Sequence, residues 1–404
     1  MHIAIFTNNY LPNPYGVSGS VESFRKELER AGHTVYVLAP SFNGYIDENK
    51  YVFRYPSIDF KFKNVRFPIA IPYSHQISRL LEKLEIDVIH SQHPNLLGWQ
   101  AKRWAKKKNV PLIFTWHTLY DQYAHFVPLI PSAWAAWWAI GNAKKYANNS
   151  DCVIVPTPSV REIISNWGVF SKKIVAIPTG VDESIFCDGD RGSQRKKLGI
   201  AEDEIVLLLV SRLTAEKNVT FLAEVVAKIL SQSTGSDAGK VKFIFAGGGD
   251  KLEVMKQIFS QAGVVEKISY LGIGDEEKRK DIYAAADIFV YASKSETQGM
   301  VISEAMYCGL PVVAVVASGV KDLVINQVTG LLVKEDEKAF TEGIKRLVDD
   351  ESLRKKFSEN ARKISRQWYT SKVCTQKLLK VYQAAISGRK ERKTKPCCSK
   401  IWTS

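Results

Sequence analysis

The chain is 404 residues long, and 45% of its residues are hydrophobic while 24% are charged, which excludes a wholly disordered protein. Its formal net charge of +14 favours an anionic partner, such as a nucleic acid, an acidic membrane or a phosphorylated substrate, although a generally basic solvated surface explains the same charge. A chain of this length is long for one hydrophobic core, so two domains are expected.

The cysteines and the N-terminal residues indicate an intracellular protein. The six cysteines are scattered, with no CxxC pair and no histidines at metal-ligand spacing, which argues against a zinc site and suits a reducing compartment. The first six residues are too few and too quickly followed by polar residues for a signal peptide, and no apolar run approaches the roughly 20 residues of a membrane-spanning helix. We therefore expect a cytosolic protein, or one attached to a membrane only at its surface.

The first half of the chain is predicted to alternate strands with helices. A short apolar strand at 3–7 leads into a loop expected to run through Gly16 and Gly19, and a helix follows at 21–31. Further strands are expected at 34–39, 88–90, 112–115, 152–156 and 174–177. The strand, loop, helix and strand at 3–39 are typical of the opening unit of a doubly wound α/β domain. The loop of this unit lacks the GxGxxG pattern, so a dinucleotide site has little support.

Histidines follow two of these strands. His117 comes soon after the strand at 112–115, and a neutral imidazole there can hydrogen-bond a sugar hydroxyl or shield a reacting carbon. His90 and His93 lie at the end of the strand at 88–90 and are interpreted as satisfied loop histidines. Asp121 and Tyr123, just beyond His117, are candidate acceptor contacts.

An aromatic and basic segment of the first half has two interpretations. Trp134, Trp137 and Trp138 are followed by two lysines, and residues 60–68 alternate aromatic with basic side chains. Such segments suit the headgroup level of a membrane, where each nearby Lys or Arg adds about 1 kcal/mol of attraction to an anionic leaflet. The alternative is a buried aromatic core whose lysines reach out to water. Single-stranded nucleic acid also binds such residues, but no RNA or DNA motif supports it.

A second series of strands begins after a polar linker at 180–196. The linker contains Asp188-Gly189-Asp190, which resembles a metal-binding pair of aspartates but is interpreted as a solvated turn because it lies away from strand ends. Strands are expected at 205–211, 242–246, 268–271, 288–291, 312–315 and 330–333, and amphipathic helix at 337–386. The predicted class is therefore α/β, with two doubly wound parallel sheets.

Two of these strands lead into polar clusters. Arg212 and Lys217 follow the strand at 205–211 and suit a diphosphate, because arginine offers a planar fork and lysine a point charge; surface salt bridges with Glu216 are the alternative. The strand at 242–246 ends in three glycines, where Gly248 permits either close approach of a ligand or a tight turn.

The segment 293–305 is the most informative. Glu296 and Glu304 are eight positions apart, with Gly299 between them, and a helix is expected to begin near Met300. Free N–H groups at a helix N-terminus bind phosphate or polarised hydroxyls, so the segment suits an elongated polar ligand such as a nucleotide-sugar. Neither GxSxG nor a P-loop occurs, which argues against a Ser-His-Asp hydrolase and against ATP hydrolysis.

These motifs together resemble the retaining glycosyltransferases of family 4, with the GT-B fold of two Rossmann-like doubly wound domains facing a central cleft. The resemblance runs over residues 1–383 and rests on Glu296 with Glu304, Arg212 with Lys217, the glycine loop at Gly16, and His117 in a Trp-His-Thr context. Residues 16–17, 117–123 and 216–218 are similar to those of bacterial 1,2-diacylglycerol 3-alpha-glucosyltransferases.

The resemblance implies a domain organisation. It predicts an N-terminal acceptor-binding domain at 1–178 and a C-terminal nucleotide-sugar-binding domain at 179–370. A C-terminal helix at 371–387 is expected to pack back on the N-terminal domain, and a basic disordered tail to follow at 388–404.

The resemblance also implies roles for single residues. Arg212 and Lys217 would grip the donor diphosphate, Glu296 would contact sugar hydroxyls and His117 would lie beside the sugar; these four are the predicted catalytic residues. The predicted donor-binding residues are Gly16, Val17, Gly248, Gln298, Gly299, Met300, Val301 and Glu304, the last for the ribose. The candidate acceptor or membrane residues are Asp121, Tyr123, Trp134, Trp137 and Trp138. No metal or other cofactor is expected to be required, beyond weak stimulation by Mg²⁺.

The implied activity is transfer of a hexose, glucose in the first place, from a UDP-sugar to a membrane lipid such as 1,2-diacylglycerol, with formation of an α-glycosidic bond. The alternative is a mannosyl- or galactosyltransferase acting on phosphatidylinositol or on a glycan of the cell envelope. The expected partners are the nucleotide-sugar donor, the lipid acceptor and an anionic membrane surface, but no nucleic acid. The expected location is the cytoplasm, with peripheral association at the inner face of the cell membrane.

Overall fold

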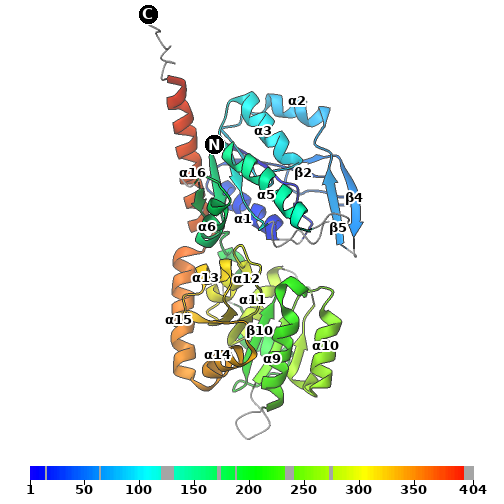
Figure 1. Cartoon of the computed structure of the whole chain (residues 1–404), viewed down its shortest axis with the longest axis vertical. Coiled ribbons are helices and arrows are strands. Elements are labelled where there is room, and N and C mark those ends of the chain that lie inside the picture. Colours follow the sequence, from blue (N-terminus) through cyan, green and yellow to red (C-terminus); the bar gives the residue numbers. More distant parts are fainter. Residues whose placement is uncertain are drawn as a thin grey trace, which may run out of the picture. The chain divides into compact units, whose positions relative to one another are not determined.

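The computed structural model describes residues 1–13, 16–62, 65–119, 132–170, 174–186, 189–232, 241–272 and 276–394. The chain forms two compact units, coloured along the sequence in Figure 1. The first unit consists of Met1–Pro156, Arg161–Ile177 and the C-terminal helix from Cys374 onward, and the second consists of Thr157–Val160 and Pro178–Val373.

The first unit is built on a parallel sheet of seven strands in the order β3-β2-β1-β6-β7-β8-β9. The strands are β1 (His2–Phe6), β2 (Thr34–Pro40), β3 (Val52–Tyr55), β6 (Val88–Ser91), β7 (Leu112–Thr115), β8 (Cys152–Val155) and β9 (Ile174–Ala176). The chain runs from β1 outward to β3 and then returns to the other side of β1 with β6. The strand order therefore reverses between β1 and β6, which is where open α/β sheets bind ligands.

The helices of the first unit are α1 (Gly16–Arg30), α2 (His75–Lys83), α3 (Leu97–Lys108), α5 (Ser132–Asn148) and α6 (Pro158–Asn166), as Figure 1 shows. The predicted loop through Gly19 is wrong, because α1 already begins at Gly16. Val21 lies in the core and Val17 packs against it, so burial of this face outweighs the modest helix propensity of the glycines and serines.

An antiparallel hairpin also belongs to the first unit. It consists of β4 (Ser57–Phe62) and β5 (Val65–Ala70), with Ile58 opposite Ile69. The aromatic and basic segment at 60–68 falls in this hairpin, but the side chains of 60–67 are outside the described part of the structure. The exposed fractions of Ile58 and Ile69 are 63% and 45%, so this face of the hairpin is apolar and open to solvent.

The second unit contains a parallel sheet of six strands in the order β12-β11-β10-β13-β14-β15. The strands are β10 (Ile205–Val210), β11 (Val241–Ala246), β12 (Ile268–Tyr270), β13 (Ile288–Tyr291), β14 (Val312–Val315) and β15 (Gly330–Val333), each within one residue of its predicted bounds. Here the strand order reverses between β10 and β13, which makes the loops after these two strands the expected place for a ligand.

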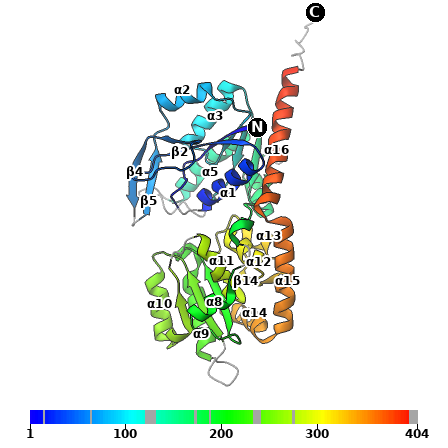
Figure 2. The same ribbon diagram turned by 180° about the vertical axis from the view of Figure 1, so that it is seen from behind.

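Helices surround this second sheet (Figures 1 and 2). They are α7 (Glu183–Phe186), α8 (Arg191–Lys197), α9 (Val219–Gln232), α10 (Leu252–Gln261), α11 (Glu276–Ala285), α12 (Met300–Tyr307), α13 (Ser318–Leu323), α14 (Glu337–Asp349) and α15 (Glu351–Trp368), with short 3₁₀ helices at Ala215–Lys217 and Val265–Lys267. The helix α9 packs against α10 and α14, α11 packs against α8, and α12 packs against α15.

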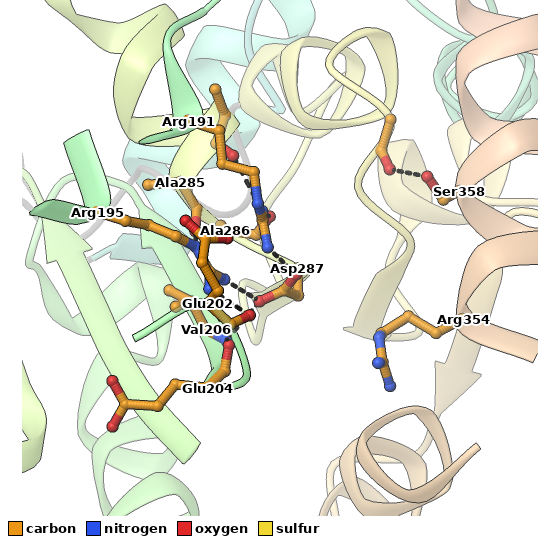
Figure 3. Close-up of polar contacts among 12 residues, drawn as sticks. Arg191, Arg195, Glu202, Glu204, Val206, Ala285, Ala286, Asp287, Arg354 and Ser358 are labelled. Carbon is orange, nitrogen blue, oxygen red and sulfur yellow. Dashed lines mark hydrogen bonds and ion pairs between the residues drawn. The ribbon is translucent and has the colours of Figure 1, made fainter. Parts of the chain in front are cut away.

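A buried arginine anchors α8 to the amino ends of the strands (Figure 3). The Arg195 side chain donates to the carbonyl oxygens of Ala285, Ala201, Glu202 and Glu204, and its Nη2 donates to Asp287 Oδ2 at 2.6 Å. Arg191 Nη2 donates to the other carboxylate oxygen of Asp287 at 2.8 Å. Each nitrogen of the buried guanidinium thus has a hydrogen-bond partner, and its charge is paired with Asp287, as a charge in a protein interior must be.

Of the two linker aspartates, the structure describes Asp190. Asp190 is the N-cap of α8, where its Oδ1 accepts from the backbone N–H of Ser193 at 2.9 Å. Asp188 lies outside the described residues. The structure therefore gives Asp190 the role of a helix cap where the sequence predicted a solvated turn, and its carboxylate satisfies a helix N–H group.

A row of side chains on α15 caps the C-termini of two other helices. Arg354, Ser358 and Arg362 are four residues apart and share one face of α15. Arg354 donates to Leu347 O at the end of α14, while Ser358 and Arg362 donate to the carbonyls of Gly309 and Cys308 at the end of α12. Figure 3 labels Arg354 and Ser358. Capping of helix C-termini therefore accounts for these two arginines.

The last helix, α16 (Ser371–Thr394), packs on the first unit. Cys374, Leu378 and Tyr382 are buried in the same core as β1 and β2, and Arg389 Nη1 lies 3.0 Å from Asp151 Oδ2. Residues 388–394 are helical, so the predicted disordered tail begins too early; Lys and Arg are good helix formers, and the Arg389 ion pair holds this turn. Residues 395–404 are outside the described part. No described helix is long and apolar enough to cross a membrane.

Candidate active site

Lys217 and Glu296 meet where the strand order of the second sheet reverses. Lys217 follows β10 and Glu296 follows β13, and the lysine Nζ forms an ion pair with Glu296 Oε1. Only 11% and 9% of these side chains is exposed. Tyr291, the last residue of β13, donates its hydroxyl to the same carboxylate oxygen at 2.6 Å. Lysine has three N–H donors, so Lys217 can bind an anion while it keeps this ion pair.

Arg212 lies in the same loop as Lys217. Its Nη2 is 3.2 Å from Glu216 Oε1, so the salt bridge that the sequence offered as an alternative is present. The Arg212 side chain is nevertheless 48% exposed, and a guanidinium has five N–H donors, of which this contact uses few. Ser295 Oγ donates to Glu216 O at 3.3 Å and so joins the loop after β10 to the loop after β13. Both cations are therefore beside the Glu296 loop.

The loop that carries Glu296 is held by its backbone. Glu296 O accepts from Gly319 N–H at 3.0 Å, and Thr297 O accepts from Thr157 Oγ1 at 2.9 Å. The Gln298 side chain makes two hydrogen bonds with the backbone of Thr179, at 2.7 and 2.8 Å. A Cβ atom at Gly319 would lie 2.6 Å from the carbonyl carbon of Thr297, so only glycine allows this close packing. The amide of Gln298 thus shapes the loop.

Helix α12 begins directly after this loop. Gly299 is its N-cap with a φ of 83°, and Met300 and Val301 are its first two residues. The first N–H groups of a helix have no carbonyl partner within the helix and attract anions or polarised hydroxyls. The predicted donor residues Gly299, Met300 and Val301 therefore lie within the same loop-to-helix turn as Glu296.

Glu304 lies one turn further along α12 and is 5% exposed. It accepts from the Tyr283 hydroxyl at 2.8 Å and lies 3.3 Å from Arg279 Nη1, both on α11. Burial and this carboxylate raise the pKa of Tyr283 well above its usual value, so the phenol stays protonated and donates. A carboxylate has about four acceptor positions, so Glu304 keeps capacity for a ligand hydroxyl.

The glycines after β11 pack against the loop after β10. A Cβ atom at Gly247 would lie 1.8 Å from Ser211 O, and one at Gly249 would lie 2.1 Å from Leu213 O. Between them, Gly248 O accepts from Leu213 N–H at 2.9 Å. The structure thus gives the glycine run a role that neither sequence interpretation named, namely close packing between two strand-end loops. A donor contact by Gly248 stays a prediction.

Three histidines gather in the first unit at the carboxyl ends of β6 and β7. His117 Nε2 lies 2.7 Å from Gln92 Oε1, and its ring centre is 6.5 Å from that of His93. His90 bridges the Tyr382 hydroxyl and Thr115 Oγ1, each at 2.7 Å. Burial lowers the pKa of His90 and His117 to about 3 and that of His93 to about 4. All three imidazoles are therefore neutral at neutral pH, as the sequence analysis assumed for His117.

The remaining predicted site residues are in the first unit. Gly16 is exposed at the start of α1, with no atom within 4 Å of a Cβ atom added there, and Val17 is partly buried. Trp134, Trp137 and Trp138 share one face of α5 and are 69%, 72% and 61% exposed, which contradicts a buried aromatic core. Asp121 and Tyr123 lie outside the described residues.

The sequence did not predict the residues that form hydrogen bonds with the side chains of the site. Tyr291 closes an apolar strand, and Gln92 lies between two histidines at a strand end, positions at which a polar group is worth testing. Tyr283 and Arg279 carried no such sequence pattern, because they lie within the helix α11, 21 and 25 residues before Glu304, and do not follow a strand.

The comparisons with known proteins agree with this geometry. A family model described as Glycosyltransferase Family 4 matches residues 14–185, and one described as Glycosyl transferases group 1 matches residues 190–364. The alpha-monoglucosyldiacylglycerol synthase of Streptococcus pneumoniae is 30% identical over 345 residues, which cover 82% of this chain and 75% of the relative. The chain belongs to glycosyltransferase family 4.

Two further similarities bear on the enzyme class and the fold of this glycosyltransferase. A GDP-mannose-dependent alpha-mannosyltransferase of Mycobacterium tuberculosis is 27% identical, with 96% of this chain and 98% of the relative covered. The Anabaena protein HepE, solved in complex with UDP and glucose, superimposes with a TM-score of 0.73 at 20% identity and covers 95% of this chain and 100% of its own. The glycosyltransferase thus has the GT-B fold, with two Rossmann-like domains, and is a hexosyltransferase.

Proposed function

We propose that this glycosyltransferase transfers glucose from a UDP-sugar to a membrane lipid such as 1,2-diacylglycerol, with retention of the α configuration. The observation that carries the proposal is the cluster of Lys217, Glu296 and Tyr291 at the point where the strand order reverses. It is followed by the N-terminus of α12 and flanked by Arg212. The similarity to monoglucosyldiacylglycerol synthases supports glucose and the lipid, and the HepE complex supports UDP.

In the proposed chemistry, the two cationic side chains stabilise the diphosphate leaving group. As the bond from the anomeric carbon to the diphosphate breaks, negative charge grows on the phosphate, and Arg212 and Lys217 stabilise it more in the transition state than in the ground state. The acceptor hydroxyl forms the new bond from the face that the leaving group vacates, and its proton passes to the departing phosphate. Glu296 accepts hydrogen bonds from sugar hydroxyls. Because these cations take the charge, no metal ion is required in this proposal.

A second candidate is a mannosyltransferase that uses GDP-mannose, since such enzymes of mycobacteria align with almost the whole chain. A screen of radiolabelled UDP- and GDP-sugars with a lipid extract separates the two. We expect label from UDP-glucose in a diacylglycerol product, and no loss of transfer when EDTA is added. Label from GDP-mannose in an inositol lipid or a glycan would establish the second candidate, and no transfer from any donor would refute both. Loss of transfer with EDTA would refute the metal-free step.

The lipid acceptor implies contact with a membrane, and we propose that α5 provides it from the cytoplasmic side. Trp134, Trp137 and Trp138 form an exposed apolar face, and Lys145 near the other end of the helix is also exposed. Indole rings prefer the headgroup level, and lysine is attracted to anionic lipids. This surface is a chemical match to an anionic bilayer.

Replacement of all three tryptophans by alanine is expected to lower binding to anionic liposomes by about tenfold or more, because each ring removes a large apolar area from water when it inserts. Flotation of the full chain with vesicles of stated anionic content measures this. Trp99→Ala is the matched control, since Trp99 is 51% exposed on another helix of the same unit. Equal flotation of the triple variant and the control would contradict the proposal, as would binding without salt dependence.

A further inference from the structure

His117 is held by one buried amide. Gln92 is 5% exposed, and its Oε1 lies 2.7 Å from His117 Nε2. Gln92 directly follows β6, and its backbone N–H donates to Phe6 O on β1 at 2.9 Å. The backbone of Gln92 is therefore held by the sheet itself, at the place where the strand order of the first unit reverses.

This contact determines which ring nitrogen of His117 carries the proton. An amide oxygen only accepts hydrogen bonds, so His117 Nε2 must donate, and a neutral imidazole has only one N–H group. The Nδ1 atom then has an unprotonated lone pair, and no hydrogen bond to it is found among the described residues. We propose that Gln92 is a positioning residue that keeps His117 in the Nε2–H tautomer, so that Nδ1 accepts a hydrogen bond from a hydroxyl group of the bound hexose. This inference rests on the proposed function, since a hexose hydroxyl is the assumed ligand.

The surroundings of His117 support a neutral ring whose Nδ1 accepts a hydrogen bond, and not a charged ring that acts as an acid. Of the described residues, the titratable groups that influence it are His93 and His90. His93 Nδ1 accepts from Asn8 N–H at 3.1 Å, so that ring carries its proton on Nε2. Burial and these two histidines lower the pKa of His117 to about 3, so it remains neutral through the range in which enzymes work. A ring that stays neutral can present the same lone pair at every such pH.

The first test reads the tautomer directly. Imidazole ¹⁵N chemical shifts of the full chain, labelled on histidine and assigned by the signal that His117→Asn removes, should show a protonated Nε2 and an unprotonated Nδ1. Gln92→Met, which keeps the volume and loses the oxygen, should produce a mixture of tautomers. If the oxygen and nitrogen of the Gln92 side-chain amide were interchanged, the wild-type ring would be protonated on Nδ1, and that result overturns the inference. An unchanged tautomer in Gln92→Met also overturns it.

The second test uses the pH profile of hexose transfer. Gln92→Glu places a carboxylate beside Nε2–H and is expected to raise the pKa of His117 by about 1–3 units above its value in the wild-type chain. Activity that needs the neutral ring should then fall at a correspondingly higher pH on the acid side. Gln76→Glu, the same change at an exposed position of α2, should leave the profile unchanged. A Gln92→Glu profile equal to that of the control overturns the inference.

The two tests keep this inference separate from the proposed function. If the wild-type chain transfers no hexose, the proposed function fails, while the ¹⁵N shifts still decide the tautomer. If the chain is active and His117 is protonated on Nδ1, only the inference fails. Gln92→Met should also lower kcat/KM by about fivefold, which is the loss that corresponds to removal of an orienting hydrogen bond of about 1 kcal/mol.

Discussion

Replacement of Glu296 by glutamine is expected to lower the kcat of hexose transfer by about 10²–10³-fold, the usual cost of removing one charged or polar group that acts in the transition state. The glutamine keeps the size of the side chain and an oxygen for the Tyr291 hydroxyl, but it loses the charge that pairs with Lys217. The measurement is initial rate at saturating donor, with circular dichroism to show that the chain is folded. Transfer at the wild-type rate would remove Glu296 from the donor site.

The Lys217–Glu296 pair also allows stability to be separated from activity. Removal of one partner leaves a charge largely buried and unpaired, which costs about 3–5 kcal/mol of folding free energy. The Lys217→Met and Glu296→Gln double variant removes both charges, so it should regain most of that stability and none of the activity. A double-mutant cycle of unfolding free energies and rates measures both quantities.

Lys294→Met is the control for this cycle, because Lys294 lies in the same loop but is 54% exposed and pairs with Glu335. It should change stability by less than about 1 kcal/mol, as exposed ion pairs do. If the double variant recovered activity together with stability, the pair would act only in folding.

Arg195→Met is expected to destabilise the second unit by about 3–5 kcal/mol, because it leaves the carboxylate of Asp287 and several buried carbonyls with fewer partners. For a unit of this size the midpoint of thermal unfolding should fall by about 10 °C. Differential scanning calorimetry of the full chain measures it.

The neighbouring Lys196→Met removes the same charge from an exposed position of α8 and should shift the midpoint by less than about 2 °C. An Arg195→Met midpoint equal to that of Lys196→Met would show that the arginine contributes nothing to the anchoring of α8. Hexose transfer at low temperature should be similar in both variants, because Arg195 binds the amino ends of the strands and the proposed site follows their carboxyl ends.

Local sequence patterns were sufficient for most of the two sheets. The strands of the second sheet are apolar runs bounded by glycine, proline or polar turns, and such runs in alternation with helices indicate a parallel sheet. The strand β3 was missed because it has only four residues and includes Arg54, and the hairpin of β4 and β5 because its residues were assigned to a surface segment. The start of α1 was missed because the glycines at 16 and 19 indicate a loop unless the core buries the intervening face.

By itself, the amino-acid sequence determined the fold class, the family and the two charged motifs, since each depends on residue types at short spacing. Tertiary structure alone decided which of these groups meet. Lys217 and Glu296 are 79 residues apart, and Gln92 and His117 are 25 apart, and both pairs become neighbours because parallel strands bring successive carboxyl ends to one edge of a sheet. The ion pair, the tautomer of His117 and the exposure of the α5 tryptophans therefore follow from strand order and burial, which no local pattern encodes.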